Sequence, residues 1–192
     1  MYKQGFYLIF ATSMLVSCAN SDELSPKPYA FHRIDLPPRS YEGWENTCAY
    51  TFEKSKAARV VMPDDTNQSC WINLEYPELQ ATVYLTYGAI RNENDLGKYI
   101  AEAQRLTYKH TIKASSIEEI PVRNAERQVY GFYYKVGGNA ASNSQFYLTD
   151  SSNHFVRGSM YFYATPRADS LAPVVTYVQA DLEQLLETFR WK

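Results

Sequence analysis

The chain has 192 residues, of which 45% are hydrophobic and 21% charged, and its formal net charge is −2 at pH 7. A chain of this size and composition can bury one sizeable core, so we expect one folded domain. The near-neutral charge argues against a surface built for nucleic acid or for anionic lipid.

The first 17 residues have the organisation of a bacterial lipoprotein signal peptide. Met1–Gln4 carry one positive charge, and an apolar run follows from Gly5 to Val16. Leu15-Val16-Ser17-Cys18 then places small residues before a single cysteine, which is the lipobox pattern. A helix over the apolar run spans about 18 Å, too short for a hydrocarbon core of about 30 Å. We therefore expect Cys18 to be the lipid anchor; the alternative is a chance cysteine behind an ordinary cleaved signal.

Removing residues 1–17 defines the mature chain. It loses Lys3 and no acidic residue, so 18 Lys and Arg stand against 21 Asp and Glu, a net charge of −3. Residues 18–28 are polar and contain prolines, which is typical of a flexible tether. We expect a single globular domain over residues 29–192.

Two further cysteines, Cys48 and Cys70, are 22 positions apart in the sequence. The envelope is an oxidising compartment, and each cysteine begins a predicted strand, so neighbouring antiparallel strands would bring them together. A disulfide between them would stabilise the fold by about 3 kcal/mol in the chain-entropy model. The alternative is two buried free thiols.

The first half of the domain consists of predicted short strands. After an extended segment at 29–41, regular structure is expected to begin near Cys48, with strands at 49–53, 58–62, 69–75 and 81–87 and a turn at 63–67. The last strand alternates, with one face made of Ala81, Val83, Leu85 and Tyr87 and the other of Thr82, Tyr84 and Thr86.

The pattern then changes to a helical period. Asn94 is the expected N-cap of a helix whose apolar stripe is Leu96, Tyr99, Ile100, Ala103, Leu106 and His110. Strands are predicted at 117–122 and 127–136, a turn at 137–139, and a hairpin of 144–149 and 154–163. The closing helix places Pro173 in its first turn, and its buried stripe is Leu171, Val174, Val175, Val178, Leu182, Leu185, Leu186 and Phe189.

Strands joined by hairpins dominate this order, which predicts an α+β fold: an antiparallel β-sheet with helices packed on its faces. The 17 tyrosines suit half-buried strands first and contact surfaces second.

The sequence shows no catalytic or metal-binding constellation. His32, His110 and His154 are scattered without metal-ligand spacing. Glu118 and Glu119 are adjacent in a predicted strand and would point to opposite faces, which makes a poor acid–base pair. We therefore expect no enzyme activity, no metal and no cofactor.

Three strings are specific to one family: Phe31-His32-Arg33-Ile34-Asp35-Leu36-Pro37, Cys70-Trp71-Ile72-Asn73-Leu74-Glu75-Tyr76-Pro77 and Glu187-Thr188-Phe189-Arg190-Trp191-Lys192. In these strings the chain resembles the GldD gliding-motility lipoproteins of the Bacteroidetes. The resemblance runs from about Pro26 to the C-terminus. It implies a non-enzymatic envelope lipoprotein that supports the assembly or stability of the gliding and type IX secretion machinery. We expect it to be anchored in the outer membrane and to face the periplasm; the alternative is surface exposure, for which the acidic segment Ser21-Asp22-Glu23 after Cys18 could be the export signal. Its implied partners are other lipoproteins and envelope proteins of that machinery, with membrane contact through the lipid alone.

Two further expectations depend on resemblance to a known fold and to a known modification motif. The element order resembles the Mog1/PsbP-type sandwich, which commonly serves as a binding scaffold. Asp169-Ser170-Leu171 matches the O-glycosylation pattern of the same phylum at Ser170; the alternative is a helix N-cap by Asp169 or Ser170.

Ligand binding is the alternative to the hypothesis that the protein is an assembly scaffold. Abundant tyrosines with Trp44, Trp71 and Trp191 could stack on sugars in a glycan- or peptide-binding lipoprotein. An aromatic-lined cleft with convergent polar groups would favour that alternative, and a filled core with a flat surface would favour the scaffold.

Overall fold

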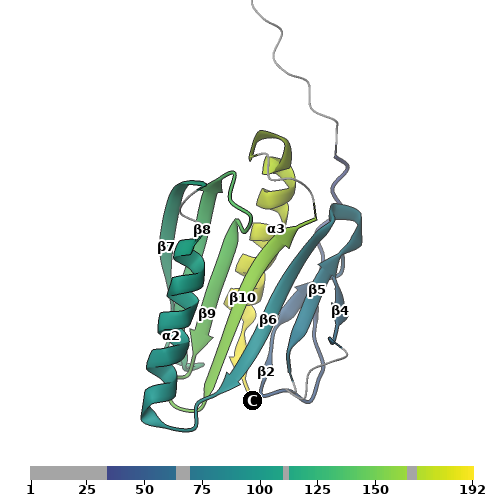
Figure 1. Ribbon diagram of the computed structural model, residues 1–192. Coiled ribbons are helices and arrows are strands. Elements are labelled where there is room, and N and C mark those ends of the chain that lie inside the picture. Colours follow the sequence, from purple (N-terminus) through teal and green to yellow (C-terminus); the bar gives the residue numbers. More distant parts are fainter. Residues whose placement is uncertain (1–33, 64–69, 110–112, 164–167) are drawn as a thin grey trace, which may run out of the picture. The chain divides into compact units, whose positions relative to one another are not determined.

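The computed structural model describes residues 34–63, 70–109, 113–163 and 168–192, all of which belong to one compact unit. A large antiparallel sheet carries helices on both faces (Figure 1), which confirms the α+β prediction. The signal peptide, Cys18, the tether and most of the predicted turn at 63–67 lie outside the described residues. No described helix has the length and apolar character needed to span a membrane.

The main sheet has seven strands, and every neighbouring pair is antiparallel. Their spatial order is β4 (Arg59–Val61), β5 (Ile72–Tyr76), β6 (Ala81–Ala89), β10 (His154–Phe162), β9 (Ser144–Thr149), β8 (Val129–Gly138) and β7 (Ala114–Asn124). After β6 the chain crosses to the far edge and returns through β7, β8, β9 and β10. β6 and β10 therefore pair along their whole lengths although they are far apart in the sequence.

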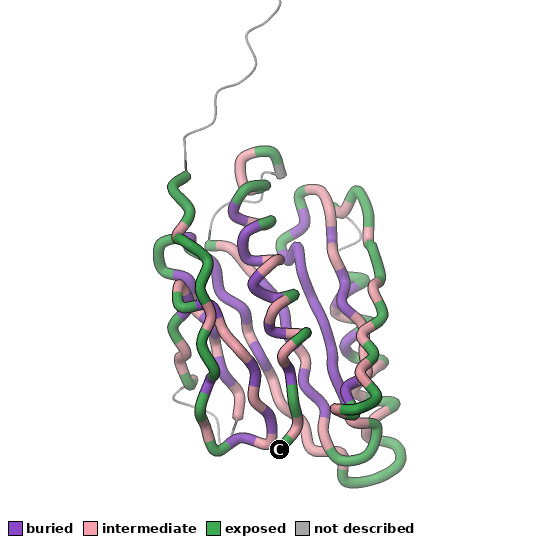
Figure 2. The backbone as a smooth tube through the Cα atoms, turned by 180° about the vertical axis from the view of Figure 1, so that it is seen from behind, coloured by how far each residue is buried: buried purple, intermediate pink, exposed green. Residues whose placement is uncertain are grey.

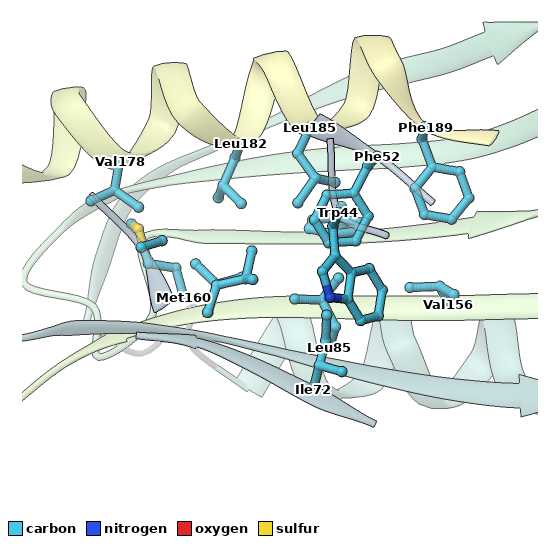
Figure 3. Close-up of a cluster of buried hydrophobic side chains, with 14 of the residues drawn as sticks. Trp44, Phe52, Ile72, Leu85, Val156, Met160, Val178, Leu182, Leu185 and Phe189 are labelled. Atoms are coloured by element: carbon cyan, nitrogen blue, oxygen red, sulfur yellow. The ribbon is translucent and has the colours of Figure 1, made fainter. Parts of the chain in front are cut away.

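One face of the sheet is covered by α3 (Ala168–Thr188). Because successive side chains of a strand point to opposite faces, every second residue faces α3. Ala81, Val83 and Leu85 from β6 and Val156 and Met160 from β10 form this side of the core. The helix contributes the predicted stripe, of which Val178, Leu182 and Leu185 are at most 1% exposed. Figure 3 shows this stripe facing the sheet, with Trp44 and Phe52 filling the space beside it.

Short strands complete the covering of this face beside α3 (Figure 2). β1 (Tyr41–Gly43) pairs with β3 (Glu53–Ser55), and β2 (Tyr50–Thr51) pairs with β11 (Arg190–Trp191) at the C-terminus. Regular structure therefore begins at Tyr41 rather than near Cys48, and the predicted strand at 49–53 is divided between β2 and β3. A 3-10 turn at Pro77–Leu79 connects β5 to β6.

The opposite face carries α2 (Glu93–Tyr108), which packs on β9 and β10 through Leu96, Tyr99, Ile100 and Ala103. Its N-cap is Asn92, so the prediction of Asn94 was wrong. The Asn92 side chain accepts from the backbone N–H of Asn94, and Asp95 accepts from the backbone of Asn92, which completes a capping box. His110, predicted to close the stripe, lies outside the described residues.

Most other boundaries differ from the sequence prediction by a few residues, notably those of α3 and β8. α3 begins at Ala168, so Pro173 lies in its second turn rather than its first. β8 continues through Gly138, where the prediction had a turn, because both glycines still pair with β7. A positive φ of 83° at Gly138 then redirects the chain, a conformation that glycine adopts without strain.

Candidate interaction surface

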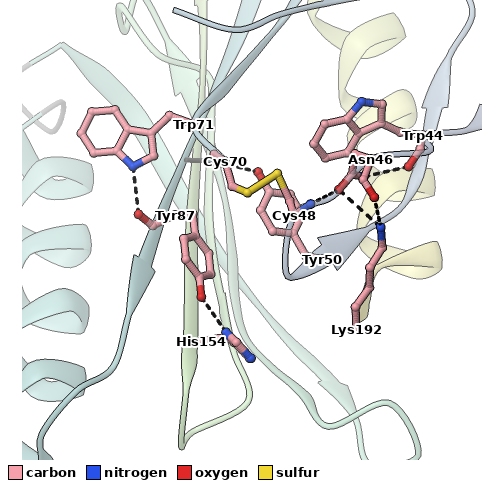
Figure 4. The surroundings of a disulfide bond; sticks show 9 residues. All are labelled: Trp44, Asn46, Cys48, Tyr50, Cys70, Trp71, Tyr87, His154 and Lys192. Carbon is pink, nitrogen blue, oxygen red and sulfur yellow. Dashed lines mark hydrogen bonds between the residues drawn. A yellow bond between two sulfur atoms is a disulfide. The ribbon is translucent and has the colours of Figure 1, made fainter. Parts of the chain in front are cut away.

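A disulfide joins Cys48 and Cys70 in the structure, with their Cα atoms 5.4 Å apart (Figure 4). The expected reason, neighbouring antiparallel strands, was wrong: β2 pairs with β11, whereas β5 belongs to the main sheet. The bond therefore connects two sheets. The Tyr50 hydroxyl crosses the same gap and donates to the Cys70 carbonyl oxygen at 2.7 Å.

The remaining predicted modification site is Ser170, half-buried in the first turn of α3. Because Asp169 also lies inside the helix, an N-cap at either residue is wrong. Asp169 instead places a negative charge at the positive end of the helix dipole. O-glycosylation of Ser170 stays a prediction.

The scattered titratable residues do not come together. His32 and His110 lie outside the described residues, and His154 shares a 2.7 Å hydrogen bond between its Nδ1 and the Tyr87 hydroxyl. Glu119 accepts from the Tyr108 hydroxyl on α2, whereas Glu118 lines a hollow beside α3, so the two acids do point to opposite faces. No group of three metal-ligating side chains forms in the part of the chain that the structure describes.

The three tryptophans are also separated. Trp44 is 7% exposed in the core, Trp71 donates through Nε1 to the Tyr87 carbonyl at 2.9 Å, and Trp191 donates to the Gln128 carbonyl at 3.0 Å. Four described surface hollows measure 250 to 490 Å³, and none is lined by tryptophan. The three tryptophans therefore line no common cleft. Aromatic residues do line the 250 Å³ hollow beside α2, where Tyr130, Phe132 and Tyr147 meet Leu96 and Ile100.

The face of the sheet that carries α2 is only partly covered. In Figure 1, α2 lies in front of β8 and β9, whereas β5 and most of β6 have no described element in front of them. We call this uncovered area the open face. Its exposed or half-exposed residues include Arg59, Val61, Asn73, Glu75, Tyr84, Thr86, Arg157, Tyr161 and Tyr163.

Tyrosines dominate the upper part of the open face. Tyr163 is 70% exposed, and its hydroxyl lies 3.4 Å from that of Tyr84 and receives a 3.2 Å hydrogen bond from Thr82 Oγ1. The Tyr161 ring meets Tyr84 edge-on at 5.9 Å between centroids. The hydrogen bond with Tyr163 and burial together raise the pKa of Tyr84 to about 12, so its hydroxyl is uncharged at neutral pH.

Charge on the open face is sparse. Arg59 and Glu75 pair at 2.6 Å across β4 and β5, which leaves Arg157 as the other charged side chain that the structure describes there. Tyrosine and arginine are enriched at protein interfaces, whereas lysine, aspartate and glutamate are depleted. The composition of the open face therefore fits a contact surface for protein.

The free edge of the sheet at β7 is less suited to binding another strand. Pro121 removes a backbone N–H, the charged Glu118 and Glu119 flank it, and the register shifts between Ala114 and Ser116. These are recognised features that discourage edge pairing. The open face, rather than this edge, is the candidate interaction surface.

The fold and surface thus define a helix-covered antiparallel sheet with one solvent-facing, tyrosine-bearing side. The chain belongs to the family described as gliding motility lipoprotein GldD, which it matches over residues 21–191. This confirms the resemblance and makes the protein a lipid-anchored envelope component associated with gliding motility. A search of curated proteins gives no significant match.

Proposed function

We propose that this lipoprotein is a non-enzymatic assembly or stability component of the gliding and type IX secretion machinery, docking on its partners through the open face. It is held by lipid on Cys18 in the outer membrane and faces the periplasm. Its partners are other lipoproteins and envelope proteins of that machinery, and it binds no nucleic acid. Its arrangement of sheet and helices is that of a Mog1/PsbP-type scaffold.

The observation that carries this proposal is the composition of the open face. A sheet surface that only has to face water is expected to be rich in charged side chains, since these are strongly hydrated. Here Tyr84, Tyr161 and Tyr163 occupy the surface, and the one acidic side chain among its described residues, Glu75, is bound to Arg59. Tyrosine supplies a large contact area at low conformational-entropy cost, which favours a protein partner.

The proposal is tested by deleting the gene in the native host and restoring it with variants. Deletion should impair spreading and type IX secretion and lower the levels of envelope partners. The wild-type gene should restore all three, and the double variant Tyr84→Ala, Tyr163→Ala should not. Tyr108→Ala is the matched control, because Tyr108 is 43% exposed on α2 outside the open face.

Each lipoprotein variant must reach wild-type abundance in the membrane fraction for the comparison to count. Normal motility, secretion and partner levels in the deletion strain would contradict the proposed function. Full restoration by the double tyrosine variant would contradict the use of the open face.

A further inference from the structure

Arg157 is a half-buried cation on β10, at the side of the open face that borders α2. Its Nη2 donates to Gln145 Oε1 at 2.7 Å, and its Nε is buried without a hydrogen-bond partner. Burial is the largest effect on the pKa of Arg157 and lowers it, and the Tyr161 side chain, which is hydrogen-bonded to Arg157, opposes this shift. None of the described carboxylates forms an ion pair with Arg157, and Glu102, which acts on it from α2, is itself paired with Arg105.

The residue that binds Arg157 is itself incompletely satisfied. Gln145 is 1% exposed on β9, and its single carbonyl oxygen also receives Thr107 Oγ1 at 3.4 Å. Its amide nitrogen, Nε2, is buried without a partner. Two unpaired donors and one positive charge therefore lie together beside the open face.

An unpaired buried donor costs about 1–3 kcal/mol, and a desolvated charge without a counter-ion costs more. The two unpaired donors are themselves buried, so a group arriving from outside reaches only the exposed part of the guanidinium, where a negatively charged acceptor would offset the cost of the uncompensated charge. A carboxylate fits best, because its two oxygens match the guanidinium fork and receive charge-assisted hydrogen bonds.

We propose that Arg157 is the point at which the open face receives a carboxylate from its protein partner, an Asp or Glu side chain. The inference rests on the proposed function, which it deepens by stating the chemistry of the partner. Tyr84, Tyr161 and Thr86 surround this position on β6 and β10, so the flanking residues of the partner would shield the ion pair from water. Such shielded arginine and tyrosine positions dominate the binding energy of protein interfaces.

The surroundings of Arg157 favour a protein carboxylate over a lipid phosphate. Lipid headgroups are recognised by clusters of several basic residues. Among the described residues of the open face, the only other cation is Arg59, and Glu75 already neutralises it at 2.6 Å. A single cation among tyrosine rings matches one acidic side chain in an otherwise neutral protein surface.

The test uses the full-length lipoprotein in its native host, with a photo-crosslinking amino acid in place of Asn73 at the margin of the open face. The crosslinked partner is identified by mass spectrometry. Arg157→Gln should lower the crosslink yield at least about tenfold, since a buried interfacial charge pair contributes more than that factor in Kd. Arg157→Lys should give an intermediate yield, because lysine lacks the bidentate fork. The matched control, Arg59→Gln, should stay within about twofold of wild type.

A second variant separates docking from folding. Gln145→Glu is nearly isosteric and supplies Arg157 with a carboxylate from within the protein, which also removes the unpaired amide. It should raise the thermal unfolding temperature and, because the site is then occupied, lower the crosslink yield. A purely structural role of Arg157 would leave the crosslink unchanged or strengthen it.

The partner's carboxylate is identified by charge exchange. The acidic residue nearest the crosslink is changed to Arg, which should abolish the crosslink with wild type and restore it with Arg157→Glu. Undiminished crosslinking by Arg157→Gln and Gln145→Glu would overturn the inference and leave the proposed function standing. Absence of any crosslink in a deletion host that also shows no defect would overturn the proposed function itself.

Discussion

Asp181 is a buried acid that serves the fold rather than the open face. It is 2% exposed on α3, and its Oδ1 accepts from the Tyr41 hydroxyl at 3.0 Å, which ties β1 to the helix. Burial raises the pKa of Asp181 above its ordinary value of 3.8, although hydrogen bonds from Ser55, Tyr41 and Tyr76 oppose the shift. The protonated form is therefore the one that the fold favours.

The raised pKa of Asp181 should be visible in the pH dependence of the stability of the fold. When folding raises the pKa of an acid, protonation of that acid stabilises the folded state. This contribution to the free energy of unfolding is fully present below the ordinary pKa of the acid, and it is lost as the pH rises through the higher pKa of the folded state. Asp181→Asn keeps an acceptor for Tyr41 and cannot ionise. Its unfolding temperature, measured by circular dichroism from about pH 4 to pH 7, should gain on that of wild type as the pH rises.

Asp150 provides a control, because folding shifts its pKa in the opposite direction from that of Asp181. Burial raises its pKa, but the backbone N–H groups of Ser152, Asn153 and His154 outweigh burial, so the pKa is lowered. The stabilisation by Asp150 is therefore present above its ordinary pKa and lost as the pH falls. Parallel pH profiles of Asp181→Asn and Asp150→Asn would contradict these assignments.

At the scale of elements, the two asparagines at the start of α2 make opposite predictions. Asn92 is the N-cap in the structure, whereas Asn94 lies within the first turn. Asn92→Ala should lower the free energy of unfolding by about 1 kcal/mol, the usual cost of losing a cap. Asn94→Ala should change it by less than about 0.5 kcal/mol. Urea titration of both variants decides between the two residues, and a larger loss for Asn94→Ala would reject the observed cap.

The disulfide is a second element-scale contact with a measurable effect. Its loop spans 22 positions, for which the chain-entropy model gives about 3 kcal/mol. The double variant Cys48→Ser, Cys70→Ser should unfold at correspondingly lower urea concentration. The intact mass of wild type purified from the envelope should increase by two hydrogens on reduction; an unchanged mass would show free thiols.

Periodicity identified the elements better than it identified their ends and partners. β9 at 144–149 has the predicted bounds, and the predicted stripes of α2 and α3 face the core, since burial along these segments follows the local period. The cap was missed although Asp95, three residues after Asn92, is the signal of a capping box. β11 was not predicted, because a strand of two residues is too short to show an alternating pattern of apolar and polar residues.

At the scale of the whole molecule, the open face depends on topology. The sequence predicts that Tyr84 and Thr86 lie opposite the core residues of β6, and they do. Whether a helix covers that side depends on the path of α2, which crosses toward β7 and packs on β9 and β10. The role assigned to Arg157 also needs the register of β10 with β9, which brings Gln145 beside it and which no local pattern reports.

The lipid anchor adds a prediction that concerns the chain as a whole. Two or three acyl chains hold a protein stably at a membrane, whereas one alone gives marginal, reversible binding. Cys18→Ala should therefore move the protein from the membrane fraction to the soluble fraction of the native host. Ser17→Ala keeps a small residue before the cysteine and should stay in the membrane fraction.

The stability of the folded domain should not depend on this change, because Cys18 precedes every element that the structure describes. The released Cys18→Ala protein should unfold at the wild-type temperature and still fail to restore gliding. A soluble domain searches the periplasm in three dimensions, whereas an anchored one meets membrane-bound partners at a high effective concentration set by its tether. Full restoration of gliding by the soluble form would show that the open face binds its partner tightly without the anchor.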